Sequence, residues 1–513
     1  MTGLERSIAL LVFRVAAAIA LVIAAAFVIW RRPILRALAA VRRDFATLPR
    51  PGFSLPLALI TLFGALLRIL DLQRPMGSDE SATFLYYASK PLLLALTIYG
   101  SPNNHLLHTA LMHASSCVFG DAEWALRLPA FLAGVAMIPL TYIAARAIQS
   151  EGALLAAALT ASWPALIDYS NDARGYTLLC FFTLIAAALM CHVIRSGNSA
   201  AVLLFAIACA LGFYTVPVML YPFVMLVAWG LTSLQRRRVA IAAIGAIVAT
   251  AILYAPVIVV SGLRALLSNP YVQPMPFGEF VRALPAYTIA VWKSMTAGVP
   301  LIIQAMIGLA LLRKRVAQAI LPAIVAVAVV LALQRVMPFP RVWLPLLPLV
   351  FCAAAGVRLS GRLKPALTLA ICICLGVIAV GKPRPRDTGE LPAVYAIVRE
   401  LEHRARPGDA ILALPPSEMP LAFYAPNLRA EILNPDWRHA RRIFVIENRA
   451  YGQTLAKTLA FFQMRANGRL IRDYGSSALY EVTPVIPSAE EREGSSSHLR
   501  SGSFAVFAAQ DDS

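Results

Sequence analysis

The polar stretch DLQRPMGSDESATFLYYASKP (residues 71–91), which resumes as SPNNHLLHTALMHASSCVFGDAEWALRLP (101–129), decides how the rest of the chain is organised. Residues 71–124 form the only long interval in the first 380 residues that is polar, acidic and rich in histidine. Long apolar runs flank this interval on both sides. We therefore interpret the apolar remainder of this part of the chain as a scaffold that holds the polar stretch.

The overall composition indicates a polytopic membrane protein. The chain has 513 residues, of which 59% are hydrophobic and only 14% are charged, and its mean hydropathy is +0.69. Soluble domains carry about 25% charged residues. The formal net charge of +19 could indicate a nucleic-acid partner, but the basic residues cluster in short loops between apolar segments, which is how membrane proteins set their orientation. We therefore expect the lipid bilayer as a partner and no nucleic acid.

Twelve apolar segments are long enough to be membrane spans, since a crossing helix needs about 17 to 25 residues. They lie approximately at residues 8–30, 53–71, 125–147, 152–168, 176–194, 199–215, 217–234, 239–260, 296–312, 317–335, 342–359 and 363–381. The predicted fold class is an all-α polytopic membrane protein with a small C-terminal α/β domain. The first segment is interpreted as a helix and not a signal peptide, because it is long and carries Arg14 inside.

The basic residues also give the expected orientation of these spans. The loop at 31–50 carries six arginines, so it should be cytoplasmic, and alternating crossings then place the other short basic loops on the same side. The segments expected on the outer side are 71–124, 169–176, 261–295, 335–341 and everything after residue 381. Eight of the eleven carboxylates in residues 1–381 fall on that side or at its rim, which indicates an outward-facing site built from carboxylates.

The adjacent acids Asp79 and Glu80 are the first candidates for that site. They stand at the start of an expected amphipathic helix over residues 81–100, where the helix dipole stabilises negative charge. A simpler interpretation is that Ser78 or Asp79 only caps that helix. The two interpretations are compatible, because a cap at a membrane surface can also act as a base.

A second group of candidates follows the turn at residues 100–102. His105 and His108 are three residues apart and share a helical face, as do Asn104 and His108 at a spacing of four. Histidines with this spacing can bind a metal, contact a phosphate or simply face the membrane interface. We expect this segment to form a helix that lies at the outer surface.

Two further outer segments carry ionisable residues. The segment DYSNDARGY (168–176) holds two acids and one arginine between apolar helices. It is either a solvated turn with a local ion pair or a second wall of the site. The proline-rich loop at 261–295, with Glu279 and Arg282 on a short helix, is interpreted as a lid or as a plain structural loop.

Three of these segments resemble those of a known family. The resemblance rests on SDESATF (78–84), on NNHLLHTALMH (103–113) with the apolar run that follows it, and on ALIDYSNDARGYTLL (165–179). In their order and spacing these motifs look like those of the polytopic glycosyltransferases of the protein O-mannosyltransferase and aminoarabinose transferase group, which have the type C fold. Such enzymes move a sugar from a polyprenyl-phosphate carrier to an acceptor at the outer face. The resemblance is good over roughly residues 57–195 and thin beyond residue 381.

The resemblance implies roles for the acidic residues. The family's aspartate–glutamate pair falls on Asp79 and Glu80, so Asp79 would be the general base. The family's second outer acidic site falls near Asp172, and Arg174 and Tyr176 match the common alanine–arginine–aromatic–tyrosine run. We therefore take all three carboxylates as catalytic candidates, and Arg174 and Tyr176 as substrate-binding candidates.

The resemblance also implies residues that contact phosphate. The family's polar or positively charged residue ahead of the surface helix falls on Asn104 and His105, with Leu106 where a proline is frequent. Arg341, in PFPRVWLPLLP (338–348), stands where an arginine–tyrosine pair is usual, although valine follows it here.

The reaction that these enzymes catalyse needs the residue types found here. A carboxylate takes the acceptor proton as the sugar carbon is attacked, and positive charge stabilises the phosphate that leaves. Candidates for the positive charge are Arg174, Arg341, Arg264, Arg282 and His105. A divalent metal is not obligatory for this chemistry, but the clustering of Glu80, His105 and His108 makes one possible. The seven cysteines lie in or beside apolar stretches, so no thiolate metal site is expected.

The chain changes character after residue 381, where sixteen of its 27 acidic residues follow. A helix near 391–405, strands at ILALPP (411–416) and RRIFVIE (441–447), a helix over about 453–466 and strands within 468–483 predict a small α/β domain. It has no glycine-rich phosphate loop, so no cofactor is assigned. The expected divisions are an extra helix with a basic loop (1–50), a glycosyltransferase-like domain (51–381), the α/β domain (382–486) and a disordered tail (487–513).

Two other classes of function stay open at this point. Twelve spans suit a transporter or flippase, although transporters usually place ionisable residues at mid-bilayer and show two similar halves, and neither is found here. A non-catalytic cell-envelope assembly protein could keep the same fold. The sequence favours a membrane glycosyltransferase of the bacterial inner membrane, with its site and C-terminal domain extracytoplasmic, acting on a polyprenyl-phosphate sugar and a lipid, protein or glycan acceptor.

Overall fold

The computed structural model describes residues 3–48, 52, 54–148, 152–355, 363–381 and 389–484. The predicted tail (487–513) lies outside these residues, as do residues 356–362 and 382–388. The described chain divides into two compact units. The membrane unit is drawn from residues 1–73 and 87–383, and the C-terminal unit from residues 74–86 and 384–513. The sequence-based boundaries stay predictions, but the contacts assign the segment 74–86 differently.

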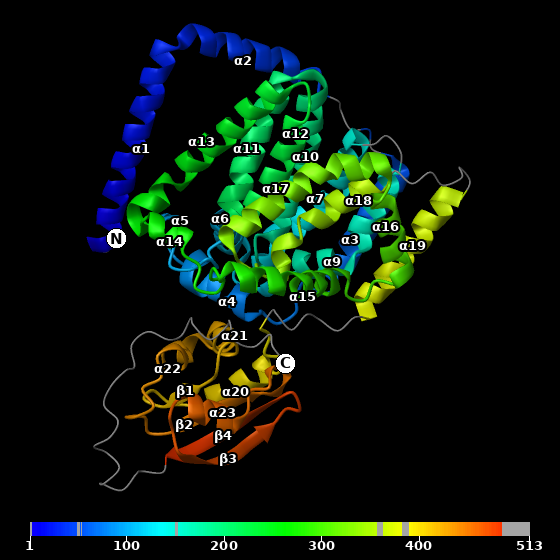
Figure 1. Ribbon diagram of the computed structural model, residues 1–513. Helices are drawn as coiled ribbons and strands as arrows, with labels where there is room; N and C mark the ends of the chain where they lie inside the picture. Colours follow the sequence, from blue (N-terminus) through cyan, green and yellow to red (C-terminus); the bar gives the residue numbers. More distant parts are fainter. Residues whose placement is uncertain are drawn as a thin grey trace. The chain divides into compact units, whose positions relative to one another are not determined.

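The membrane unit is entirely helical in its described part. Its elements are α1 (Gly3–Ile29), α2 (Arg31–Phe45), α3 (Leu55–Ile69), α5 (Leu92–Thr97), α6 (Leu106–Phe119), α7 (Glu123–Ile148), α8 (Ala153–Ser162), α9 (Pro164–Ser170), α10 (Tyr176–Ser196), α11 (Ser199–Thr215), a 3₁₀ turn (Pro217–Met219), α12 (Leu220–Leu231), α13 (Arg236–Ser261), α14 (Leu263–Leu267), α15 (Phe277–Thr296), α16 (Leu301–Leu311), α17 (Lys314–Gln334), a 3₁₀ turn (Pro340–Trp343), α18 (Leu346–Ala354) and α19 (Leu363–Gly381). Helices α7, α10 and α11 run side by side (Figure 1).

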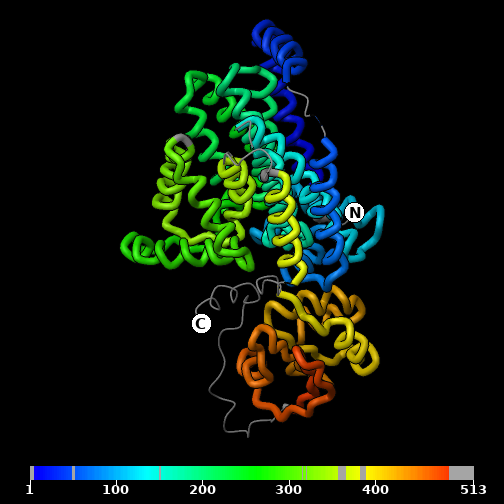
Figure 2. Tube along the Cα trace, turned by 90° about the vertical axis from the view of Figure 1, so that its right-hand side faces the viewer, coloured from blue at the N-terminus to red at the C-terminus, as the bar shows by residue number. Residues whose placement is uncertain are grey.

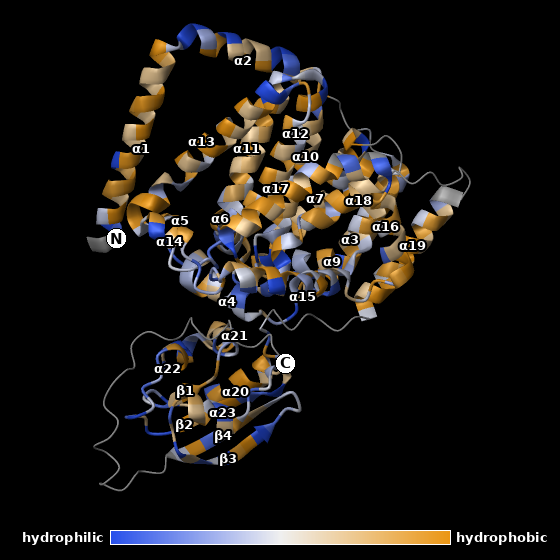
Figure 3. Cartoon of the chain, in the orientation of Figure 1, coloured by the Kyte–Doolittle hydropathy of each residue, from blue (hydrophilic) through white to orange (hydrophobic). Residues whose placement is uncertain are grey.

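Five of the described helices are long and apolar enough to cross a membrane by themselves, and a sixth crossing results if the bent pair α15 and α16 is one span. Six shorter apolar helices of 10–17 residues accompany them. Hydrophobic residues dominate along these helices, as Figure 3 shows. The prediction of a mostly helical membrane protein is confirmed, whereas the number twelve stays a prediction.

Two sequence-based assignments differ from the structure at prolines. The expected span 152–168 is broken between α8 and α9, where Pro164 starts a new helix. The expected loop at 261–295 contains a 20-residue helix, α15, which meets α16 at an angle of 117°. Both views show α15 lying across the direction of the neighbouring helices (Figures 1 and 2). The short helix expected there with Glu279 and Arg282 is thus longer than predicted, and it contains Pro285.

A buried arginine ties three helices of the membrane unit together. Arg68 of α3 is fully buried and donates from Nη1 to the Ala161 carbonyl and from Nη2 to the Thr160 carbonyl, at 2.8 and 3.1 Å. Its Nε donates to Ser170 Oγ at 3.0 Å. These bonds link α3 to the last turns of α8 and α9, so this arginine fixes the helices that lead into the turn after Ser170.

The C-terminal unit combines helices with one four-stranded sheet. Its elements are α4 (Ser78–Thr83), α20 (Val394–Arg404), β1 (Ala410–Leu412), α21 (Glu418–Tyr424), a 3₁₀ turn (Pro426–Leu428), α22 (Arg429–Leu433), β2 (Ile443–Asn448), a 3₁₀ turn (Arg449–Tyr451), α23 (Leu455–Phe461), β3 (Ala466–Asp473) and β4 (Ser477–Pro484). The strand order is β1-β2-β4-β3, with β1 parallel to β2 and the other pairs antiparallel. The predicted α/β character is confirmed, while the short helices α21 and α22 were not predicted.

Strand β2 is the centre of this sheet. All six of its residues are buried, and Ile443 and Val445 pack in one cluster with Ala410, Leu412 and Val482. A strand buried on both faces is expected to be continuously apolar, which is why RRIFVIE was recognisable in the sequence.

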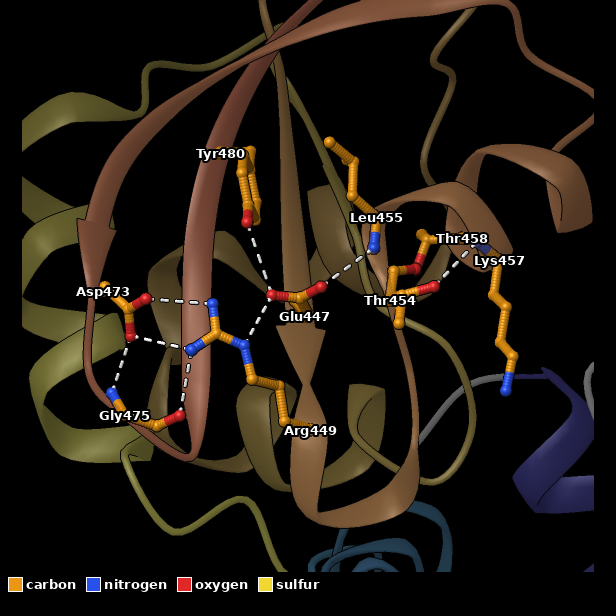
Figure 4. Close-up of polar contacts among 9 residues, drawn as sticks. All are labelled: Glu447, Arg449, Thr454, Leu455, Lys457, Thr458, Asp473, Gly475 and Tyr480. Atoms are coloured by element: carbon orange, nitrogen blue, oxygen red, sulfur yellow. Dashed lines mark hydrogen bonds and ion pairs between the residues drawn. The ribbon is translucent and has the colours of Figure 1, made fainter.

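An ion-pair network closes one end of the sheet (Figure 4). Glu447 accepts hydrogen bonds from Arg449 Nε at 3.0 Å and from the Tyr480 hydroxyl at 3.4 Å. Arg449 also pairs with Asp473 at 2.9 Å, and its hydrogen bond holds the pKa of the Asp473 carboxyl below its usual range. The network joins β2, β3 and β4, and we interpret it as structural.

We predict that Arg68→Met destabilises the membrane unit by about 3–5 kcal/mol, because it leaves several buried acceptors without their charged donor. The measurement is the thermal unfolding midpoint of the purified protein in detergent. Arg146→Met is the matched control, since Arg146 is exposed and donates to the hydroxyl of Tyr142, one turn before it on the same helix. Equal midpoints for the two variants would contradict the role given to Arg68.

Candidate active site

The candidate site of the membrane unit forms where α9 ends and α10 begins. The turn residues Asn171 to Gly175 lie between these helices, and Arg174 within the turn is only 3% exposed. The Arg174 amide donates to the Asp172 carbonyl at 2.6 Å, which holds the turn tight. The segment is therefore a buried turn, and the interpretation of it as a solvated surface turn is wrong.

A hydrogen bond from this turn orients His105, the residue just before α6. The Gly175 amide donates to His105 Nδ1 at 2.9 Å, so the proton of a neutral imidazole has to be on Nε2. Arg174 Nη2 lies 3.4 Å from that same Nε2. Two N–H groups thus lie beside each other, which is an arrangement that an anionic oxygen can accept from.

Tyr176 contacts His105, Arg174 and Arg341. We call these four residues the basic cluster. The rings of His105 and Tyr176 meet edge to face at 5.2 Å, and the Arg174 guanidinium lies 5.6 Å from the tyrosine ring centre. Arg341 donates from Nε to the Tyr176 hydroxyl at 3.1 Å. The four residues come from three widely separated parts of the sequence, and all four were predicted site residues.

The electrostatics of the basic cluster favour a neutral histidine. His105 is 2% exposed, and this burial lowers its pKa well below the usual value, with further lowering from Arg174, His108 and Arg341. Two guanidinium groups on the same aromatic ring repel each other, and an anion bound between them would offset that repulsion. The cluster therefore has the donors and the charge to bind a phosphate group.

The other predicted binding residues of the membrane unit have different surroundings. Asn104 is buried, and its amide donates to the carbonyls of Ala95 and Ile98, while its oxygen accepts from Thr109. His108 is fully buried within α6, which differs from a helix face open at the surface. Arg282 lies exposed on α15, outside the basic cluster.

A separate set of predicted site residues lies in the acidic segment, residues 74–86, which folds with the C-terminal unit. Glu80 is 1% exposed and accepts from the Gly77 amide at 2.8 Å, so it closes the first turn of α4. The cap predicted at Ser78 or Asp79 is wrong, because Gly77 holds that position. Asp79 is half-buried and is therefore the more accessible of the two carboxylates. Glu80 has a structural role.

The helix predicted over 81–100 is interrupted. Helix α4 passes into a π-helical turn at Phe84–Ala88, and α5 starts only at Leu92. Pro91 explains the break, because proline lacks an amide hydrogen and disfavours helical geometry in the residue before it. The acids therefore stand on a short helix of six residues.

Glu418 of α21 is a buried carboxyl that sequence reasoning missed. Helix α21 packs on α4, and burial raises the pKa of Glu418 to about 8. Its charge in turn raises the pKa of Tyr86, after the larger effect of that residue's own burial. The only sign of this carboxyl in the sequence is the glutamate within the apolar segment LPPSEMPLAF (414–423), and that segment is equally typical of an exposed loop.

Metal binding finds no support in the described part of the chain. No group of three or more histidine, cysteine, aspartate or glutamate side chains there could hold a metal ion. The possible metal at Glu80, His105 and His108 is therefore not taken further.

The chain is similar to known proteins both in sequence and in fold. Residues 102–263 match the family model described as dolichyl-phosphate-mannose-protein mannosyltransferase. No curated protein matches the sequence. The crystal structure of ArnT from Cupriavidus metallidurans in the apo state is 14% identical, with a TM-score of 0.57 over 83% of this chain and 97% of that one. The same protein bound to undecaprenyl phosphate is 16% identical, with a TM-score of 0.52 over the same shares.

This chain has the fold that its sequence resemblance implied. The match to ArnT covers nearly the whole of that protein, and the family model covers the segment that contains His105 and Arg174. Together with the apolar helices, this makes the chain an integral membrane protein. The predicted type C glycosyltransferase-like fold is confirmed.

We predict that His105 stays neutral at pH 6, with its proton on Nε2, because burial and the neighbouring guanidinium groups disfavour the imidazolium form. The measurement is the ring ¹⁵N chemical shifts of histidine-labelled protein, assigned by comparison with His105→Gln. The exposed His439 serves as the internal reference. An Nδ1-protonated or doubly protonated ring would contradict the orientation deduced from Gly175.

We predict that Glu418→Gln stabilises the C-terminal unit by about 1–3 kcal/mol at pH 8. Because the folded pKa is raised from 4.5 to about 8, the folded state keeps a proton that the unfolded state has lost between these values. Stability therefore falls as pH rises through this window, and the variant should not show that fall. The measurement is hydrogen exchange of β2 peptides in the full chain at pH 4.5 and 8, with the exposed Glu402→Gln as control. An unchanged pH dependence would contradict the burial of Glu418.

Proposed function

We propose that this protein is a membrane glycosyltransferase that moves a sugar from a polyprenyl-phosphate carrier to an acceptor at the outer face of the membrane, with inversion. The observation that carries the proposal is the convergence of His105, Arg174 and Arg341 on Tyr176. A largely buried, doubly cationic cluster with an imidazole N–H is suited to a phosphate that gains charge as its bond to the sugar breaks.

The proton chemistry is assigned to the acidic segment. An oxygen or nitrogen of the acceptor attacks the anomeric carbon, and the bond from that carbon to the phosphate oxygen breaks. The polyprenyl phosphate leaves with the bonding electrons, and Asp79 takes the proton that the acceptor loses. Glu80 keeps its place as the closing group of α4, and Asp172 supports the turn that carries Arg174.

The relatives support the class of donor. The ArnT structure from Cupriavidus metallidurans is known with undecaprenyl phosphate bound, and the matching family model is named for dolichyl-phosphate-mannose. Undecaprenyl phosphate and dolichyl phosphate are both polyprenyl phosphates. We therefore propose a polyprenyl phosphate as the carrier of the sugar in this protein. The proposed acceptor is a lipid, a protein or a glycan.

The location follows from the basic residues. The arginines of residues 31–50 favour a cytoplasmic position for that loop. Alternating crossings then favour an extracytoplasmic position for the acidic segment, for the basic cluster and for the C-terminal unit. We propose the bacterial inner membrane, because that membrane displays polyprenyl-phosphate sugars to extracytoplasmic enzymes.

We predict that Asp79→Asn lowers sugar transfer by about 10²–10⁴-fold, which is the usual contribution of a general base. Transfer is measured in membranes supplied with radiolabelled polyprenyl-phosphate sugars at matched protein levels. Asp121→Asn is the control, since Asp121 is an exposed acid between α6 and α7 and should transfer like the wild type.

Three outcomes separate the possibilities. Loss in Asp79→Asn alone supports the assignment of the base. Transfer that survives this change would move the base to Glu80 or Asp172. Wild-type protein that transfers none of the common sugars would contradict the proposed function and favour transport or envelope assembly.

A further inference from the structure

The acidic segment has an unusual position in the chain. Residues 74–86 are joined at both ends to the membrane unit, at Gln73 and at Tyr87, yet they fold with residues that follow residue 383. Asp79 lies in the middle of this segment. The backbone that carries the proposed base is thus fixed by the C-terminal unit.

The contacts on the segment come mainly from α21. The Met76 amide donates to the Tyr424 hydroxyl at 2.8 Å. The ring of Phe84 meets that of Phe423 edge to face at 5.5 Å. These two contacts lie on either side of Asp79, three residues before it and five after it, so they restrain α4 at both ends.

A second pair of contacts holds the start of the segment. The Ser78 amide donates to the Gly389 carbonyl at 3.2 Å, and Arg74 forms an ion pair with Glu390 at 3.3 Å. Gly389 has a φ of +65°, and a Cβ there would come within 2.6 Å of Ser78 Cβ. Only glycine allows this close approach without strain.

Helix α21 is itself anchored to the sheet. Asn448, at the end of β2, donates to Ser417 Oγ at 2.9 Å, and Ser417 Oγ donates to Gln453 Oε1 at 2.8 Å. All three side chains are buried, and Ser417 directly precedes α21. A buried, hydrogen-bonded support of this kind fixes the orientation of whatever it carries.

We propose that the C-terminal unit positions the proposed catalytic base, with Phe423 and Tyr424 of α21 as the positioning residues. This inference rests on the proposed function, in which Asp79 takes the acceptor proton. It gives the C-terminal unit a part in the reaction. Small misplacements of a reacting group lower the rate by up to about 100-fold, so loss of these contacts should reduce turnover.

Hydrogen exchange of the full-length protein in lipid nanodiscs tests the docking itself. Peptides covering residues 74–86 should exchange about tenfold or more faster in Phe423→Ala and in Phe84→Ala, because these changes release the segment. Tyr424→Phe should release Met76 with little risk to folding. The matched controls in the same unit are Phe462→Ala and Tyr480→Phe, which alter the sheet core and the Glu447 network, and should leave this peptide unchanged.

Transfer kinetics test the positioning. We expect Phe423→Ala and Tyr424→Phe to lower kcat, by about 10-fold and about 3-fold, with the KM for the polyprenyl-phosphate donor changed less than about 2-fold. The double variant Phe84→Ala with Phe423→Ala should be no slower than either single one, because both remove the same contact. A merely destabilised protein would instead lose kcat in the control variants as well.

The outcomes distinguish this inference from the proposed function. Faster exchange together with lower kcat, absent from both controls, supports it. Unchanged exchange of residues 74–86 in all α21 variants would overturn the docking, and faster exchange with full kcat would overturn the positioning. If the wild type transfers no sugar, the proposed function and the positioning role both fail, while the exchange data still decide whether α21 holds the segment.

Discussion

The hydrogen bond from the Gly175 amide to His105 Nδ1, at 2.9 Å, is the interaction on which the candidate site of the membrane unit depends. It joins the start of α6 to the turn before α10, two places about 70 residues apart in the sequence. It also decides which ring nitrogen carries the proton. A Cβ at Gly175 would come within 2.7 Å of Thr215 Cγ2 and within 3.2 Å of that same Nδ1, so a side chain there would crowd the ring that this bond orients.

Burial gives this bond its chemical meaning. His105, Arg174 and Tyr176 are each less than 7% exposed, and charge interactions are stronger where water is excluded. The aromatic face of Tyr176 accommodates two guanidinium groups, which contact it as cation–π neighbours. A cluster that keeps its histidine neutral and its arginines charged discriminates in favour of anions, and the cationic part does not vary near neutral pH because arginine does not lose its proton there.

The helical fold and the residues of the basic cluster could be predicted, because apolar runs and the order of motifs are visible in the sequence itself. It could not show that the Asn104 amide donates hydrogen bonds to the carbonyls of Ala95 and Ile98. Nor could it show that Glu80 accepts from the Gly77 amide and closes the first turn of α4. These hydrogen bonds depend on which backbone donors and acceptors have no partner within the secondary structure of the fold. The role of α21 was equally hidden, because Met76 and Tyr424 are separated by 348 positions and short helices carry little periodicity.

The assignment of the acidic segment to the C-terminal unit has a physical reason. Helix α4 has only six residues, too few to be stable without tertiary contacts, and its N-terminus carries two adjacent acids whose repulsion opposes folding. Packing on α21 supplies apolar contact through Phe84 and Phe423, while the helix dipole and the Gly77 amide favour the two negative charges. A base held on so short a helix is only as well placed as the surface beneath it. Selection for a well-placed carboxylate at Asp79 would therefore act on α21 and its anchors as strongly as on the segment itself.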